Sequence, residues 1–202
     1  MLKVWGRINS LNVKKVLWCA DELDLEFEHV NAGGVDDPDY RALNPNGLIP
    51  CLQDDALVLW ESNAIVRYLL ARYGDEPLYA HDPALRAEAD KWMDWVTSSM
   101  DAPFCDVFMN AVRLPPEQRD GAIRDQGVAT CSTLLARADS VLAHQPYLSG
   151  SALGMGDIPL GCMAYAWFGM PIERPALSHL ESWYQRLTER AAYRRQVMTP
   201  LT

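Results

Sequence analysis

The sequence predicts a protein of two parts, a mixed α/β part of residues 1–77 and an all-helical part of residues 84–202. Two observations predict this fold class. Short extended segments alternate with amphipathic helical segments only before residue 77, and strand patterns nearly vanish after it. A stretch rich in glycine, proline and acidic residues, 74–83, separates the parts and is typical of a linker.

The first elements form a β-α-β unit. Residues 2–5 and 27–30 have extended patterns, so we expect two strands there. Between them, apolar residues recur at helical spacing and predict a helix of about three turns: Val13, Val16, Leu17, Ala20 and Leu23. Two strands joined through a helix favour a parallel pair with a right-handed crossover.

The next elements predict a hairpin and a second helix. Proline cannot donate to a sheet ladder, so Pro50 marks a strand entry or an edge. Residues 51–52 and 57–60 are extended on either side of a turn at Asp54 and Asp55. An apolar stripe then predicts a helix that ends at Gly74: Ala64, Ile65, Tyr68, Leu69 and Tyr73. The order β-α-β followed by β-β-α is the thioredoxin-like arrangement.

Helical patterns fill the second part, over 84–111, 116–144, 157–169 and 178–190. Kinks are expected at Pro103 and Pro159, because proline removes a helical hydrogen bond.

Composition narrows the function classes. The chain is 49% hydrophobic and 22% charged, as in ordinary soluble globular proteins. It contains no apolar run long enough for a membrane span, which takes about 18 residues, and residues 1–5 do not resemble a signal peptide, so we expect a cytoplasmic protein. A net charge of −9 without a basic cluster makes nucleic acid a poor partner. The five cysteines lack metal-ligand spacing, which predicts buried thiols and no metal.

One pattern points to a ligand site. An isoleucine–proline pair at a strand entry, which can be cis, precedes a glutamate and a serine at a predicted helix start. A carboxylate, a hydroxyl and free helix N–H groups then meet at one place. Such a place suits a small peptide-like ligand that carries both a carboxylate and an ammonium group.

The chain resembles the glutathione S-transferase superfamily, in particular its bacterial serine-type members related to theta and nu. The motifs that carry the resemblance are 44–50 (NPNGLIP), 59–65 (LWESNAI), 89–95 (ADKWMDW), 147–150 (YLSG) and 156–158 (GDI). The last two resemble the family's buried folding motif. There a serine or threonine usually caps the helix three residues before the aspartate, where this chain has Gly154. The resemblance covers nearly the whole chain and implies a homodimer of two-domain subunits.

The resemblance implies that glutathione is the co-substrate. Ile49, before a cis Pro50, would pair its backbone with the cysteinyl residue of glutathione. Glu61 and Ser62 would hold the γ-glutamyl end. Leu48 occupies a position where many relatives have lysine or glutamine, so one contact to the glycyl residue is expected to be missing and affinity to be modest.

The catalytic position falls in residues 9–14, where the family places it. No tyrosine or cysteine occurs there, which argues against a mixed-disulfide mechanism. Ser10 or Asn12 would donate a hydrogen bond to the glutathione sulfur, and the choice between them stays open. For Arg7, Lys14 and Lys15 we expect solvated surface positions, although one of them could meet the glycyl carboxylate.

The second substrate would lie against the helical part. Phe104, Phe108 and Arg113 are the candidates for a hydrophobic electrophile pocket, and the phenylalanines are equally compatible with plain core. The predicted function is a glutathione transferase that stabilises the thiolate for attack on the electrophile. Two alternatives remain: a glutathione-dependent peroxidase or isomerase, and a non-catalytic binding or regulatory module with the same fold.

Overall fold

The computed structural model describes residues 1–32, 34 and 36–202. A four-stranded sheet has the order β2-β1-β3-β4, with β1 at Leu2–Trp5, β2 at Phe27–Val30, β3 at Cys51–Asp54 and β4 at Leu57–Trp60. β1 pairs in parallel with β2, and β3 is antiparallel to both β1 and β4. The predicted parallel pair and hairpin are both present, so the thioredoxin-like assignment is confirmed.

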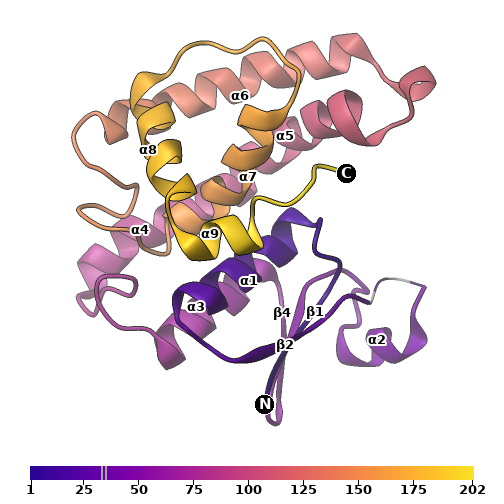
Figure 1. Cartoon of the computed structure of the whole chain (residues 1–202), viewed down its shortest axis with the longest axis vertical. Helices are drawn as coiled ribbons and strands as arrows, with labels where there is room; N and C mark the ends of the chain where they lie inside the picture. The colour runs from indigo at the N-terminus through magenta and orange to yellow at the C-terminus, as the bar shows by residue number, and fades with distance from the viewer. Residues whose placement is uncertain (33, 35) are drawn as a thin grey trace.

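Two long helices pack on this sheet, α1 (Leu11–Glu22) and α3 (Ser62–Tyr73). Figure 1 shows them on the side of the sheet that faces the helices of the second part. Val4, Val16, Leu52, Ile65 and Leu69 are fully buried between these layers. The alternation of strands with amphipathic helices therefore closes a common core, as the sequence pattern predicts.

A short helix, α2 (Pro38–Leu43), was not expected. Its start has two ordinary helix signals. The Asp37 side chain accepts hydrogen bonds from the backbone N–H groups of Asp39 and Tyr40, and Pro38 occupies the first helical position. Six residues are too few for a periodic apolar stripe, so only these capping signals mark the helix.

The regular secondary structure described in the second part is helical, apart from an isolated bridge between Tyr147 and Gly150. It comprises α4 (Pro83–Trp95), α5 (Asp101–Phe108), α6 (Gly121–Leu142), α7 (Asp157–Gly169), α8 (Ser178–Thr188) and α9 (Ala191–Gln196). The single helix expected over 84–111 is divided by two π-helical turns, η1 (Val96–Met100) and η2 (Met109–Arg113). A 3₁₀ turn, η3 (Pro116–Gln118), precedes α6. The pattern expected over 178–190 corresponds to α8, and α9, which follows it, was not expected.

The two prolines that were expected to cause kinks behave differently. Pro103 is the third residue of α5, which continues directly from η1; it has no N–H to bond to the carbonyl of Ser99, four residues back in the π-helical turn, and the regular helix is interrupted at that turn. Pro159 is the third residue of α7, where backbone N–H groups have no partner within the helix. The kink expected at Pro159 is therefore wrong, and α7 continues to Gly169.

The folding motif is built around a buried carboxylate. Asp157 has no exposed surface and accepts hydrogen bonds from the backbone N–H groups of Leu148, Ser149 and Gly154 and from the indole of Trp183. The Ser149 hydroxyl accepts from the N–H of Gly156, the N-cap of α7. A serine thus bonds to the helix start from the preceding loop, and Gly154 leaves it space: a Cβ there would lie 2.7 Å from that of Ser149.

Helix α1 joins the two parts. Trp18 on α1 packs against Gly161 of α7, where a Cβ would come within 2.7 Å of the indole, and meets the Tyr193 ring edge-on at 4.8 Å. At the end of α1, Glu22 makes two hydrogen bonds with the guanidinium of Arg190, at 2.6 and 2.8 Å. Both parts therefore hold α1 in place. Among the described residues, none of the helices is long and apolar enough to cross a membrane.

Candidate active site

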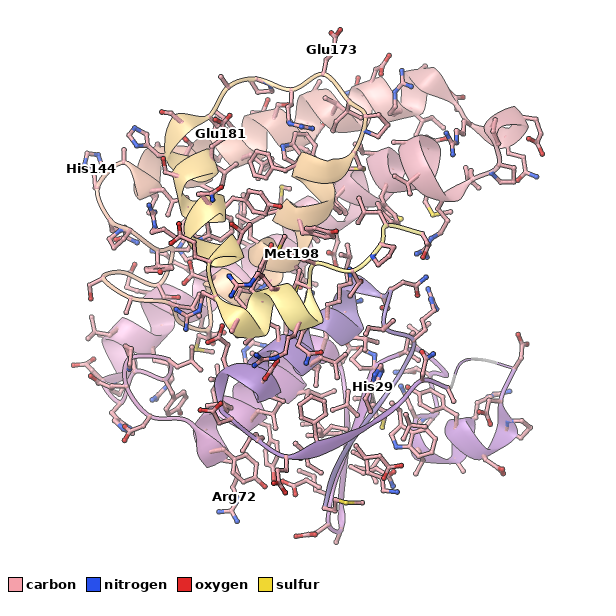
Figure 2. The ribbon with its side chains drawn as sticks, in the orientation of Figure 1. His29, Arg72, His144, Glu173, Glu181 and Met198 are labelled. Atoms are coloured by element: carbon pink, nitrogen blue, oxygen red, sulfur yellow. The ribbon has the colours of Figure 1, made fainter. Side chains whose placement is uncertain are left out.

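The first component of the site is the loop between β1 and α1. Gly6 has φ +139°, and a Cβ on it would lie 2.5 Å from the Val13 side chain and 3.0 Å from Ile49. Only glycine allows this approach. His29 of β2 (Figure 2) holds the loop through a 2.8 Å hydrogen bond between its Nε2 and the Gly6 carbonyl. The loop and the segment before β3 are therefore packed side by side.

The second component is the backbone before β3. The Ile49–Pro50 peptide bond is cis, as expected. The preceding Leu48 carbonyl accepts two hydrogen bonds, from the Tyr40 hydroxyl at 2.8 Å and from the Asn44 amide at 2.6 Å. These two side chains, from α2 and its end, fix the backbone that presents Ile49. The Leu48 side chain itself is 63% exposed and offers no polar group.

The third component is the start of α3. Glu61 has φ +73°, a conformation that is uncommon for a residue with a side chain and that tends to occur at functional sites. Ser62 follows as the first helical residue and is 8% exposed. Its hydroxyl donates to the Asn12 side-chain oxygen at 3.2 Å. This hydrogen bond connects the start of α3 to the first turn of α1.

A cavity of about 490 Å³ opens between α1, the start of α3 and the region of α4 and η1. Its wall includes the charged side chains of Lys15, Glu61, Arg67, Asp94 and Asp101. Lys15 is only 1% exposed, and no hydrogen bond or ion pair to its amine is found among the described residues. Burial lowers the pKa of Lys15, and Asp101 partly offsets this effect. Burial raises the pKa of Asp101, against the opposing influence of Lys15.

The expectation of solvated surface positions is wrong for Lys14 and Lys15. Both are 1% exposed because α1 is covered by α3 on one side and by α7 and α9 on the other. The Lys14 amine donates to the Val197 carbonyl at 3.0 Å and lies over the Tyr165 ring. Arg7, in contrast, is exposed as expected.

A second cavity of about 550 Å³ adjoins the first. Ser10, Phe104, Phe108 and Arg113 all line it, so the structure brings the catalytic serine candidate and the three electrophile-pocket candidates to one place. Its other walls are Arg7, Asn9, Leu11, Asn12, Thr97, Asp101, Ala102, Cys105, Met109 and Met163. The two phenylalanines are also part of the core, at 3% and 9% exposure.

Three residues line both cavities, Asn12, Thr97 and Asp101. The sequence analysis did not identify Thr97 or Asp101, because both lie inside a helical pattern in which only a kink at Pro103 is expected. The π-helical turns place them: η1 contains Thr97 and ends immediately before Asp101, and η2 contributes Met109 and Arg113 to the second cavity. Such turns are frequent at functional sites. Proline in mid-helix was the one available signal.

The cysteine side chains are buried at four positions and exposed at one. Cys19, Cys51, Cys131 and Cys162 are buried, and burial raises the pKa of Cys162 to about 12. Cys105 is exposed and lines the second cavity. Within the described ranges, no three His, Cys, Asp or Glu side chains gather as a metal site would require.

Comparison with known proteins agrees with this geometry. Residues 8–77 match the family model of the glutathione S-transferase N-terminal domain. The chain is 46% identical over its full length to the glutathione S-transferase GstB of Escherichia coli, which is also covered in full. A theta class glutathione S-transferase from Xanthomonas axonopodis pv. citri, solved with glutathione bound, superposes with a TM-score of 0.96 at 56% identity, over 100% of this chain and 99% of that one.

The fold and the site define a thioredoxin-like domain with an appended helical domain, whose facing surfaces enclose two adjoining cavities. Together with the full-length similarity, this places the chain in the glutathione S-transferase family. The predicted fold class, family and enzyme class are confirmed.

Proposed function

We propose that the protein is a glutathione transferase that binds glutathione in the 490 Å³ cavity and ionises its thiol at the junction with the 550 Å³ cavity. The observation that carries the proposal is the convergence of three elements on one place: the start of α3, the cis Ile49–Pro50 backbone and the N-terminus of α1. We also propose that residues 1–77 form the glutathione-binding domain and residues 84–202 form the helical domain.

The γ-glutamyl end of glutathione carries a carboxylate and an ammonium group, and the first cavity offers partners for both. The free N–H groups at the start of α3 suit the carboxylate, and the buried Ser62 hydroxyl would turn from Asn12 to donate to it as well. Glu61 and Asp101 supply two carboxylates for the ammonium. Lys15 adds a buried positive charge that offsets one of these two carboxylates, and Arg67 in the same wall is paired with Asp94, so one negative charge remains for the ammonium.

The cysteinyl residue of glutathione would then lie along the backbone of Leu48, Ile49 and Pro50. The N–H and C=O of the half-buried Ile49 would form a short antiparallel ladder with the peptide ligand, because β-type pairing needs only main-chain groups. Leu48 contributes its backbone position rather than a polar side chain. We therefore propose that the protein binds glutathione with modest affinity, because the Leu48 side chain makes no polar contact with the glycyl residue.

The sulfur is activated by a hydrogen-bond donor at the N-terminus of α1. Ser10 is the N-cap of α1, yet its hydroxyl makes no capping hydrogen bond and lines the cavity. Asn12 uses its side-chain oxygen to accept from Ser62. That bond fixes the orientation of the Asn12 amide, whereas the Ser10 hydroxyl is uncommitted and can rotate toward the thiolate, so we favour Ser10 as the donor. No general base is needed, since hydrogen bonds to the anion and the helix dipole lower the thiol pKa.

The acceptor substrate would enter the second cavity. Leu11, Phe104, Phe108 and Met163 give it an apolar wall next to the sulfur position. An apolar wall binds a hydrophobic electrophile and keeps water from the thiolate. Detoxification of such compounds in the cytoplasm is the corresponding physiological role.

Two measurements test the function. Calorimetric titration with glutathione should give one saturable site per chain, and the purified protein should accelerate conjugation of 1-chloro-2,4-dinitrobenzene. Binding without conjugation would favour the peroxidase, isomerase or binding-module alternatives. Absence of binding would exclude glutathione as co-substrate. Glu61→Gln should weaken glutathione binding by about tenfold, as expected for one charged hydrogen bond, whereas the exposed Glu88→Gln on α4 should not.

A further inference from the structure

Lys15 differs from the other lysines of the chain in having no partner for its amine. Lysine occurs four times in the sequence. Lys3 and Lys91 form ion pairs with glutamates, and Lys14 donates to the Val197 carbonyl. Among the described residues, only Lys15 lacks such a partner, although its side chain is 1% exposed. A buried charge without a partner is costly, so an anion from outside the chain would be bound favourably there.

Lys14 shows that burial on α1 does not by itself leave an amine without a partner. It is as buried as Lys15, and its amine lies 3.0 Å from the Val197 carbonyl oxygen and over the Tyr165 ring. Successive residues of a helix point in directions about 100° apart. Lys15 lines the 490 Å³ cavity, whereas Lys14 is not part of its wall. The amine without a protein partner is therefore the one that borders the cavity.

The position of Lys15 on α1 directs it toward the start of α3. Asn12 and Lys15 are three residues apart and therefore share one face of the helix. On that face, the Asn12 side-chain oxygen accepts the hydrogen bond from Ser62. The Cα–Cβ bonds of a helix tilt toward its N-terminus, so the Lys15 side chain starts in the direction of Asn12. Lys15 and the free N–H groups at the start of α3 thus border the same cavity.

The wall of this cavity offers positive and negative groups that are not paired with each other. Glu61 and Asp101 line it, yet in the part of the chain that the structure describes neither forms an ion pair with Lys15. Arg67 and Asp94, in contrast, are paired with each other. A ligand that carries an anion and a cation close together can therefore bind both kinds of group. A bound anion also favours the protonated amine, against burial, which lowers the pKa of Lys15.

We propose that Lys15 is a specificity-determining residue of the glutathione cavity, whose ammonium binds the α-carboxylate of the γ-glutamyl residue together with the N–H groups at the start of α3. The γ-glutamyl residue carries this carboxylate and an ammonium on one carbon, which matches the separate charges of the wall. Charge-assisted hydrogen bonds are strong, and they weaken less in a buried site than in water. This inference rests on the proposed binding of glutathione and specifies how its γ-glutamyl end is recognised.

The glycyl carboxylate is the other anion of glutathione. In the proposed orientation it lies beyond the cysteinyl residue, near Leu48, which is not part of the wall that contains Lys15. The α-carboxylate is therefore the better match for Lys15, and an experiment has to distinguish the two carboxylates.

Three ligands make this distinction in calorimetric titrations. The first is S-hexylglutathione. The second has 4-aminobutanoyl in place of the γ-glutamyl residue, so it keeps the ammonium and lacks only the α-carboxylate. The third ends in glycinamide and lacks only the glycyl carboxylate charge. All three are S-hexyl thioethers, so their binding does not depend on ionisation of the thiol. The hexyl chain would rest on the apolar wall of the second cavity and keep the weaker ligands measurable.

Two variants of Lys15 and one of Lys14 give the prediction. Lys15→Met should raise Kd for S-hexylglutathione and for the glycinamide ligand by roughly tenfold, the value of one charged hydrogen bond. Kd for the 4-aminobutanoyl ligand should stay within about twofold, and Lys15→Gln should give the same pattern. Lys14→Met removes an equally buried amine outside the cavity and should change none of the three values. Removal of a buried charge that has no partner should not lower the urea midpoint of Lys15→Met.

The outcomes separate this inference from the proposed function. No binding of glutathione or S-hexylglutathione to the parent contradicts the function itself. Binding that the Lys15 variants leave unchanged, or weaken equally for all three ligands, overturns the role of Lys15 and leaves the function intact. A loss that disappears only with the glycinamide ligand assigns Lys15 to the glycyl carboxylate and also overturns the inference. A loss that disappears only with the 4-aminobutanoyl ligand supports it.

Discussion

Replacement of Ser10 by alanine is the sharpest test of how the thiol is activated. A free thiol with a pKa near 8.5 is only about 3% ionised at pH 7. A hydrogen bond to a charged group contributes roughly 1.5–3 kcal/mol, and one pKa unit corresponds to about 1.36 kcal/mol. Loss of the Ser10 hydroxyl should therefore raise the pKa of bound glutathione by about one to two units.

The pH dependence of turnover follows from this shift in the thiol pKa. If the bound thiol of the parent has a pKa of about 6.5, two units below the free value, roughly three quarters of it is ionised at pH 7, so the alanine variant should turn over about 3- to 25-fold more slowly at that pH. The deficit should shrink as the pH rises through the higher thiol pKa. Ultraviolet difference titration of the bound thiolate, together with the pH profile of kcat, measures both quantities.

The structure also predicts what Ser10→Ala should leave unchanged. The Ser10 hydroxyl makes no capping hydrogen bond, and the backbone carbonyl that starts α1 is retained in alanine. The free energy of unfolding should therefore stay within about 0.5 kcal/mol of that of the parent, the range of ordinary surface substitutions. Ser10→Thr keeps a hydroxyl and should retain most activity. A normal thiolate titration in Ser10→Ala, with a raised pKa in Asn12→Ala, would refute the argument and assign the role to Asn12.

Three further outcomes follow from the described contacts. Ser62→Ala should raise KM for glutathione more than it lowers kcat, because the contact is remote from the sulfur; an unchanged KM in steady-state kinetics would contradict this placement. Asp157→Asn should lower the free energy of unfolding by about 3 kcal/mol or more, since four N–H donors lose a buried carboxylate, with KM unaffected; urea denaturation with unchanged midpoint would argue otherwise. Sedimentation at micromolar concentration should show a homodimer, for which we expect an interface above about 2,000 Å²; a species of only 22.7 kDa would exclude the dimer.

Periodicity was sufficient to predict the sheet and most of the helices. The β1–β2 crossover and the β3–β4 hairpin follow from local patterns that burial reinforces, as at Val4 and Leu52. Short elements were missed, because α2 and α9 have six residues each and carry no stripe. For α2, the Asp37–Pro38 capping signal was available in the sequence.

The residues of the candidate site likewise fall into those that the sequence could predict and those that it could not. Residues within motifs were predictable, as for Ile49 and Ser62, because the residue types themselves carry the chemistry. Lys15 was misjudged because a charged residue on an amphipathic helix ordinarily faces solvent, whereas here a second domain covers that face. Asp101 depends on the rotation introduced by a π-helical turn, which apolar spacing cannot reveal.

The two π-helical turns suggest how acceptor preference could change during evolution. Each successive residue of an α-helix is rotated by about 100° around the axis, since a turn takes 3.6 residues. Loss or gain of one residue in η2 would therefore present a different set of side chains to the second cavity, while α1, α3 and η1 stay in place. A length change in η1 would also move Thr97 and Asp101, which line the glutathione cavity. Chain length at η2, as much as residue identity, would then diversify the acceptor range while the glutathione cavity keeps its walls.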